Sequence, residues 1–172
     1  MLTIDTARLR LQPCTVAAAQ AASTDRAALE AQLGVRVPEE WPAIDLQDFL
    51  PVYGQMVGEA AANAGWGIWL ILLPAEGTLA GDIGFKGPPD ADGTVEIGYS
   101  VLPAWQGRGL ATEAARALVA WAQAQPRVLR VVAECLADNP ASARVLEKAG
   151  FQRSGQRDDL LLWEIPPGAV VQ

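Results

Sequence analysis

The sequence predicts an α/β (α+β) fold built on one mixed, mostly antiparallel sheet of about seven strands with about four helices. Three observations predict it. Segments with the two-residue period of strands alternate with segments of helical periodicity. Three strand-like segments in the middle of the chain are joined by short turns, which favours an antiparallel meander. A strand, a helix and a second strand then occupy residues 94–136, and such a crossover is right-handed and pairs its strands in parallel.

The N-terminal part begins with a strand and continues into helices. Residues 7–11 alternate Arg with Leu, which is typical of a half-buried strand. Residues 15–33 are rich in Ala, Gln and Glu without Pro, which predicts a helix that ends at Gly34. Asp45 can cap a further helix, which Pro51 makes irregular. The apolar positions of that helix include Phe49, Tyr53, Met56 and Val57.

The C-terminal part contains most of the strands. We expect strands over residues 68–73, 78–86, 94–102, 128–136, 152–156 and 160–165. A helix that starts at about Gly109 and ends before Pro126 forms the crossover. A second helix over residues 140–149 has Asn139 as its N-cap and Gly150 just past its end.

Length and composition favour one folded domain. The chain has 172 residues, close to the usual size of a single domain, and it contains no linker-like segment. Hydrophobic residues make up 51% and charged residues only 19%, too apolar and too weakly charged for a disordered chain. We therefore expect residues 1–172 to form a single domain.

Charge and residue usage exclude several classes of function. The formal net charge is −7, which argues against nucleic acid as a partner and would suit a cationic substrate. The chain has no His, so it has no Ser-His-Asp triad, no Cys-His pair and no imidazole metal site. Proton chemistry must use carboxylates, Tyr, Cys or water, and we expect no metal.

The cysteines and the apolar runs predict where the protein works. Cys14 and Cys135 are too few for a disulfide framework, and their apolar surroundings indicate buried thiols in a reducing compartment. Charged residues occur near the N-terminus, and the longest apolar run, residues 66–75, is about half the length that spans a bilayer. We expect a cytoplasmic protein with no membrane partner.

A glycine-containing turn at the start of the crossover helix has the features of an anion site. Within residues 101–114 a strand runs into the turn and the turn becomes a helix, whose first N–H groups point at one place. Gly107 and Gly109 let a diphosphate approach the backbone, Arg108 adds charge and Gln106 can donate a hydrogen bond. The motif is neither a Walker loop nor a dinucleotide fingerprint. The alternative is an ordinary strand-to-helix turn that uses Gly for tight packing.

Three blocks of sequence resemble one known family. Residues 95–114 resemble the acetyl-CoA motif of the GCN5-related N-acetyltransferases (GNATs), with the core Gln/Arg-x-x-Gly-x-Gly/Ala. That core corresponds here to Gln106, Gly109 and Ala111. Residues 138–151 are similar to the Asn-x-x-Ser…Glu-Lys-x-Gly-Phe segment of the RimJ/RimL-like ribosomal-protein N-acetyltransferases, and residues 6–11 also fit that branch. The blocks follow the family order and cover nearly the whole chain.

The resemblance implies a sheet whose central strands splay to admit coenzyme A, with acetyl-CoA as co-substrate. The residues that it assigns to coenzyme A are Tyr99, Ser100, Val101, Gln106, Gly107, Arg108, Gly109, Leu110, Ala111, Thr112, Asn139 and Ser142. Two of these assignments have a structural alternative. Asn139 can serve only as a helix cap, and residues 99–101 can belong to an ordinary central strand. Trp105, just before the glycines, is expected to anchor the loop.

The resemblance also implies direct transfer, in which a neutral amine attacks the thioester carbonyl and a backbone N–H stabilises the oxyanion. Glu96 is the leading candidate for the base, directly or through water, and Glu134 is the reserve. The alternative is that Glu96 only orients the substrate or pairs with an Arg. Many family members protonate the thiolate with a Tyr where this chain has Leu146, so Ser142 inherits that role, unless it is only a capping residue.

The sequence does not identify the acceptor substrate. We expect an N-acetyltransferase that acts on a primary amine, either a protein N-terminus or a small amine, as a monomer or homodimer. The alternatives are a non-catalytic acyl-CoA-binding sensor or interaction module, and a regulator that binds another diphosphate. The aromatic residues expected either to line the acceptor groove or to fill the core are Trp41, Phe49, Tyr53, Trp66 and Tyr99.

Overall fold

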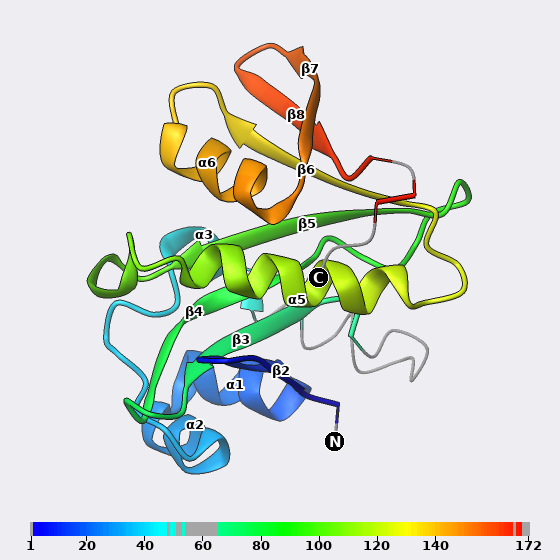
Figure 1. Cartoon of the computed structure of the whole chain (residues 1–172). Helices are drawn as coiled ribbons and strands as arrows, with labels where there is room; N and C mark the ends of the chain where they lie inside the picture. The colour runs from blue at the N-terminus through cyan, green and yellow to red at the C-terminus, as the bar shows by residue number, and fades with distance from the viewer. Residues whose placement is uncertain (1, 48, 51–52, 54–64, 167, 170–172) are drawn as a thin grey trace.

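The structure is a computed structural model that describes residues 2–47, 49–50, 53, 65–166 and 168–169. The described strands form one eight-stranded sheet in the order β1-β2-β3-β4-β5-β6-β8-β7 (Figure 1). Among these eight described strands, only β5 and β6 pair in parallel, and every other neighbouring pair is antiparallel. The predicted mixed, mostly antiparallel sheet with one parallel crossover is confirmed.

The elements keep most of the predicted bounds. The strands are β1 (Ile4–Asp5), β2 (Arg10–Pro13), β3 (Ile68–Leu73), β4 (Thr78–Phe85), β5 (Thr94–Val101), β6 (Arg130–Leu136), β7 (Gln152–Arg157) and β8 (Leu160–Glu164). The helices are α1 (Val16–Thr24), α2 (Arg26–Leu33), α3 (Ile44–Gln47), α5 (Leu110–Gln123) and α6 (Pro140–Ala149), with a 3-10 turn at η2 (Pro103–Trp105). No helix in these described ranges is long and apolar enough to cross a membrane.

The hydrophobic core lies on both faces of the sheet. Strand β3 is buried along its whole length, as expected for a strand covered on both sides. Trp69 and Ile71 face a cluster that includes the apolar side of α5, whereas Leu70 and Leu72 face a cluster that includes α1 and α2. In Figure 1, α5 crosses one face of the sheet and α1 and α2 lie near its N-terminal edge.

The N-terminal strand predicted over residues 7–11 is wrong in its bounds. The structure instead has two short strands joined by a turn, in which the Thr6 N–H donates to the Leu9 carbonyl at 2.8 Å. Arg8 lies in this turn and its backbone N–H and guanidinium bond Glu113, so the residue is not part of the ladder. This extra strand raises the number from the expected seven to eight.

The helix predicted over residues 15–33 is divided in two at Asp25. That residue has φ −152° and ψ 88°, outside the helical region, and its carboxylate accepts from the Ala28 N–H at 3.0 Å. An Asp in an Ala-rich run therefore caps a new helix rather than extending the old one. Gly34 ends the second helix with φ 68°, as predicted.

Two further boundaries differ from prediction. Helix α3 begins at Ile44, so Asp45 lies within the helix and is not its cap, while Pro51, Met56 and Val57 lie outside the described residues. Strand β6 begins at Arg130 rather than at residue 128 because the preceding residues form a turn, in which the Val128 N–H donates to the Gln125 carbonyl at 3.2 Å.

The central strands separate after a short paired stretch. Strands β5 and β6 are paired only from Thr94 to Ile97, opposite Arg130 to Ala133. Beyond Ile97, β5 remains paired with β4, and β6 remains paired with β8. The two strands diverge toward the left of Figure 1, where α6 and the start of α5 lie on either side of the gap. This splay positions the candidate site.

Candidate active site

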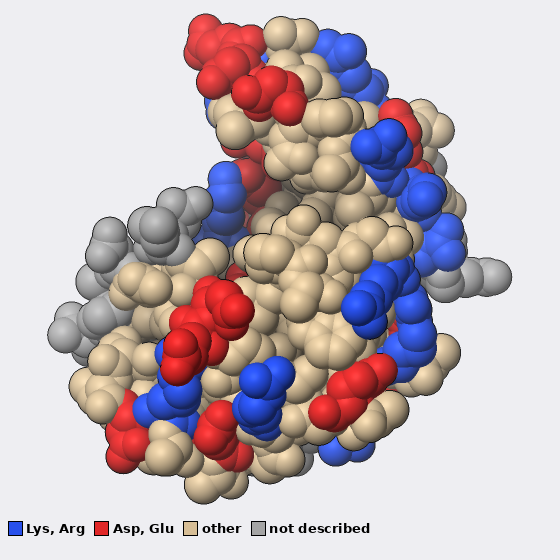
Figure 2. All heavy atoms as spheres, turned by 90° about the vertical axis from the view of Figure 1, so that its left-hand side faces the viewer, with Lys and Arg blue, Asp and Glu red and all other residues tan. Residues whose placement is uncertain are grey.

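A cleft of about 550 Å³ opens where β5 and β6 separate. All the residues predicted to contact coenzyme A line it, except Arg108. The structure adds residues that the sequence reasoning missed, which are Trp105, Ala141, Arg144, Val145 and Lys148. Four of these lie on α6, where their three- and four-residue spacing places them on one helix face. Figure 2 shows the deep notch in this side of the molecule.

The glycine turn leaves the start of α5 open toward the cleft. Gly107 has φ 72° and Gly109 has φ 78°, left-handed conformations that favour glycine at both positions. Gly109 is the N-cap of α5, and no side chain caps the helix. The first-turn N–H groups and the positive end of the helix dipole therefore remain available to an anion.

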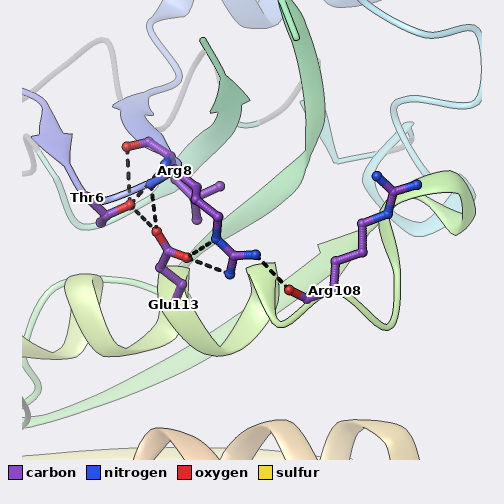
Figure 3. A network of polar contacts seen from close by, with 5 residues as sticks. Thr6, Arg8, Arg108 and Glu113 are labelled. Carbon is purple, nitrogen blue, oxygen red and sulfur yellow. Dashed lines mark hydrogen bonds and ion pairs between the residues drawn. The ribbon is translucent and has the colours of Figure 1, made fainter. Parts of the chain in front are cut away.

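A charged network holds this turn from the N-terminal edge of the sheet (Figure 3). The Arg8 guanidinium bonds Glu113 through Nε at 2.7 Å, and its Nη1 donates to the Arg108 carbonyl at 2.8 Å. The Thr6 hydroxyl donates to the other Glu113 oxygen at 2.6 Å. Burial alone would raise the pKa of Glu113, but the hydrogen bonds from Thr6 and Arg8 together lower it. Glu113 is thus ionised, and the positive charge of Arg8 balances its negative charge beside the open start of α5.

The Arg108 side chain does not point into the cleft. Its guanidinium lies over the Trp105 ring, 4.7 Å from the ring centroid, and Figure 3 shows it directed away from Glu113. The interaction of a cation with an aromatic face keeps it there. Trp105 packs against both hydrophobic clusters, which agrees with its predicted role as anchor of the loop.

Two polar residues of the motif have structural partners. The Gln106 side chain donates to the Val101 carbonyl at 2.8 Å, so it ties the loop back to β5. The Asn139 side chain accepts from the Ser142 N–H at 3.0 Å and caps α6. Both residues also line the cleft. Asn139 therefore caps α6, as the structural alternative proposed, and it also lies at the cleft.

The backbone of β5 presents hydrogen-bonding groups to the cleft. In the ladder with β4, the Lys86 N–H donates to the Glu96 carbonyl and the Leu102 N–H donates to the Ala80 carbonyl. Because such bonds alternate along an antiparallel pair, the backbone groups of Tyr99 and Val101 point to the opposite edge, which is the splayed one. Tyr99 therefore presents both an N–H and a carbonyl at the cleft wall.

Tyr99 and Ser142 join β5 to α6 across the cleft. The Tyr99 hydroxyl donates to the Ser142 carbonyl at 3.1 Å and lies 2.9 Å from the Ser142 hydroxyl. Burial raises the pKa of Tyr99 to about 12, so the phenol remains protonated near neutral pH. Both residues are candidates from the sequence, but their pairing was not predicted. Leu146, at the position of the family Tyr, is fully buried in the core.

The two predicted carboxylates lie on the other face of the sheet. Ile97 is buried in the cluster that includes α5, so its neighbour Glu96 points to the opposite side. Glu96 forms an ion pair with Lys86. Glu134 bonds Arg157 at 2.7 Å and lies 3.9 Å from Lys86. The structure therefore does not bring Glu96 or Glu134 together with Ser142 in the cleft.

A second cavity, of about 350 Å³, opens beside the central strands and is lined by three of the five aromatic residues named from the sequence. Of the other two, Trp41 is buried in the core and Tyr99 lines the first cleft. We call it the aromatic cavity and define it by Phe49, Tyr53, Trp66, Phe85 and Asp82, all of which line it. Ring contacts order its walls, with centroids 5.7 Å apart for Phe49 and Tyr53 and 5.2 Å apart for Trp66 and Phe85. Phe49, Tyr53 and Trp66 were expected either to line the acceptor groove or to fill the core, and they line this cavity.

Asp82 is the acidic residue that lines this cavity, and it was not among the candidates from the sequence. Its carboxylate accepts from the Trp41 indole N–H at 2.9 Å. Burial raises the pKa of Asp82 to about 6, against the opposing effect of that hydrogen bond. Burial, and then the charge of Asp82, raise the pKa of Cys14 to about 12, so this buried thiol is not ionised at neutral pH. The available signal was one acidic residue within the apolar segment over residues 79–85.

A mixed sheet that splays beside an uncapped helix start defines a known class of acyl-transferring enzymes. Residues 8–152 match the sequence family described as Acetyltransferase (GNAT) domain. The chain belongs to this GNAT acetyltransferase family, and it is an N-acetyltransferase.

The relatives include several N-acetyltransferases. The Bacillus subtilis (strain 168) protein described as "Uncharacterized N-acetyltransferase YjdG" is 32% identical over 151 residues, which cover 88% of this chain and 90% of that protein. The Escherichia coli (strain K12) ribosomal protein uS5-alanine N-acetyltransferase is 35% identical over 66 residues, covering 38% of this chain and 34% of that protein. The predicted resemblance to the RimJ/RimL-like branch is confirmed at this level.

The fold likeness extends over almost the whole chain. RimL, a ribosomal L7/L12 alpha-N-protein acetyltransferase solved in complex with coenzyme A, superposes with a TM-score of 0.68 at 20% identity. The superposition covers 95% of this chain and 97% of that one. At this identity the likeness shows a shared fold.

Proposed function

We propose that this protein transfers an acetyl group from acetyl-CoA to a primary amine by direct attack, with residues 1–172 acting as one domain. The observation that carries the proposal is the uncapped start of α5, which opens into the 550 Å³ cleft at the splay of β5 and β6. An anion site joined to a groove with exposed backbone groups suits a ligand with a diphosphate and an amide-containing arm.

The residues present fit coenzyme A. The N–H groups of Leu110, Ala111 and Thr112 would hold the diphosphate, and Gly107 and Gly109 leave the backbone accessible. The basic side chains of Arg144 and Lys148 line the same cleft and would add favourable charge. The backbone groups of Tyr99 would pair with the amides of the pantetheine arm.

The protein residues supply positioning and proton transfer. Acetyl-CoA supplies a thioester carbonyl that a neutral amine can attack, and the Tyr99 N–H would stabilise the oxyanion. Glu96 would take the amine proton, directly or through water, once it is released from Lys86. The Ser142 hydroxyl, paired with Tyr99, would donate a proton to the departing sulfur. A thiol with a pKa of about 8.5 needs little such help.

The acceptor is a primary amine on a protein N-terminus or on a small molecule. The family and the names of the ribosomal-protein relatives support an amine acceptor. The net charge of −7 supports a cationic one. The aromatic cavity, at about 350 Å³, has room for one small amine or one terminal residue.

The placement of the diphosphate is tested by adding a negative charge to the open helix start. Ala111→Glu is expected to weaken acetyl-CoA binding at least tenfold by isothermal titration calorimetry, because the new carboxylate repels the diphosphate. Ala124→Glu places the same side chain at the exposed far end of α5 and should leave the affinity unchanged. Equal affinities in both variants would contradict the proposal.

A further inference from the structure

The aromatic cavity is lined by a carboxylate, that of Asp82, which forms no ion pair with the described part of the chain. Asp82 belongs to none of the ion pairs formed within the described ranges. Trp41 donates one hydrogen bond to it, whereas an ionised carboxylate can accept about four. A carboxylate in apolar surroundings costs free energy unless a cation or further donors bind it. The cavity therefore has the capacity to bind a cationic group.

The strand register leaves open space beside Asp82. On the same face of the sheet, Asp82 stands opposite Ser100, and the next pair along is Gly84 with Gly98. Neither glycine has a side chain to occupy the cavity floor. A Cβ added to Gly98 would meet nothing within 4 Å, although one added to Gly84 would meet the Gly67 carbonyl at 2.3 Å. The open volume thus lies over Gly98, next to the carboxylate.

The open space is also close to the coenzyme cleft. Gly98 lines the aromatic cavity, and the next residue along β5, Tyr99, lines the cleft. Successive residues of a strand point to opposite faces, so the two cavities approach each other from the two sides of β5. The backbone is splayed from β6 at this point, because the pairing ends at Ile97. A group bound over Gly98 would meet a group that enters through the splay.

We propose that the aromatic cavity is the acceptor site and that Asp82 binds the ammonium group of the acceptor. The proposal rests on the proposed acetyl transfer and adds a substrate class, namely primary amines with an apolar or aromatic substituent. Asp82 would neutralise the ammonium, and the rings of Phe49 and Tyr53 would contact the substituent and the cation. Lys86 also lines the cavity. Its charge is paired with Glu96, and a second cation would be disfavoured next to Lys86.

The test compares two probes of similar shape and opposite charge, phenethylammonium and 3-phenylpropionate, on the full chain with saturating coenzyme A. Binding is followed by NMR through the Trp41 indole N–H, which donates to Asp82. We expect phenethylammonium to shift this resonance in a saturable manner and 3-phenylpropionate to leave it unchanged. Binding of the anion, or of neither probe, would overturn the proposal.

Asp82→Asn is the matched variant, because the Asn carbonyl can still accept from Trp41 and preserve the local structure. It should weaken phenethylammonium binding at least tenfold and raise KM for the amine more than it lowers kcat. Asp159→Asn, at an exposed turn between β7 and β8, makes the same chemical change and should alter neither quantity. Wild-type amine affinity in Asp82→Asn would overturn the role of Asp82.

Gly98→Val tests the cavity without touching Asp82. The added side chain enters the open space and should abolish phenethylammonium binding while the acetyl-CoA affinity stays within twofold. Amine binding that survives this change would place the acceptor elsewhere. The two proposals fail separately: loss of the proposed function would appear as a wild-type protein that does not bind acetyl-CoA. Tight acetyl-CoA binding with amine binding indifferent to Asp82 would overturn only this inference.

Discussion

At the scale of single residues, the same side-chain chemistry has different consequences in different surroundings. Glu96, Glu134 and Asp82 are all carboxylates on one face of the central strands. Glu96 and Glu134 have basic partners, whereas Asp82 lines the aromatic cavity and accepts a hydrogen bond from an indole. Burial raises the pKa of Asp82, because it disfavours the charged form and Asp82 belongs to no ion pair among the described residues.

The proposed base gives a prediction at this scale. Glu96→Gln should lower kcat by roughly 100-fold, the usual contribution of a general base, and leave the acetyl-CoA affinity unchanged. Steady-state kinetics by thiol release, with calorimetry for acetyl-CoA, measure the two quantities. Glu134→Gln removes the neighbouring carboxylate that also approaches Lys86 and serves as the control. A fully active Glu96→Gln would exclude Glu96 as the base.

The raised pKa of Asp82 predicts how the stability of the folded protein depends on pH. Its folded pKa of about 6 lies above the ordinary value of 3.8, so the folded state holds this proton more tightly than the unfolded state. The contribution of Asp82 to the free energy of unfolding is therefore most favourable below about pH 4. It is lost as the pH rises through about 6. Asp82→Asn removes that loss and should stabilise the protein by about 1–3 kcal/mol at pH 8.

Urea denaturation of both proteins at pH 4 and pH 8 measures this difference. The gain from Asp82→Asn should be small at pH 4, where the wild-type carboxyl is protonated in the folded state. The Trp41 indole resonance of the wild-type protein should move with a midpoint near pH 6, since the indole donates to the titrating carboxylate. A pH-independent difference between the two proteins would show that the carboxylate carries no burial cost.

At the scale of elements, the start of α5 is held by contacts from the distant N-terminal turn. Arg8 bonds both the Glu113 carboxylate and the Arg108 carbonyl, 105 and 100 residues further along the chain. Glu113 lies in the first turn of α5, where a carboxylate suits the helix dipole but would repel an anionic ligand. Arg8 neutralises it, so the anion site is formed by two elements together.

Arg8→Met should therefore weaken acetyl-CoA binding about fivefold or more, because the negative charge of Glu113 in the first turn of α5 would then lose its cation. The double variant Arg8→Met/Glu113→Gln should recover part of the affinity, since it removes the exposed charge as well. Calorimetry on the single and double variants measures the coupling. Arg10→Met breaks only an ion pair with Asp5 and should have no effect. Failure of the double variant to recover would assign Arg8 a purely structural role.

At the scale of the whole molecule, the two cavities proposed for the donor and for the acceptor both lie beside β5. The cleft proposed for coenzyme A is lined by β5, α6 and the start of α5. The aromatic cavity is lined by β4, β5 and a few described residues before or at the start of β3, namely Leu46, Phe49, Tyr53, Trp66, Gly67 and Ile68. The splay of β5 from β6 lies between them. Such a layout suits direct transfer, because both substrates can be held at once in their own cavities and meet at the gap.

Local signals in the sequence determined much of the fold and of the cleft. Helix α6 has the predicted bounds because Asn139 and Gly150 act within one turn of its ends. Strand β3 also has its predicted bounds, because its apolar run is bounded by a turn. The glycine turn was predicted because its backbone conformation depends on its own residues.

Tertiary structure alone decided what depends on partners distant in the sequence. It placed Glu96 beside Lys86 on the face away from Ser142, stacked Arg108 on Trp105, and brought Asp82 within hydrogen-bond distance of the Trp41 indole. Periodicity assigns a side chain to one of two faces, but strand pairing and packing choose the neighbours on that face. Since a carboxylate acquires its chemistry from those neighbours, the roles of the acidic residues required the folded chain.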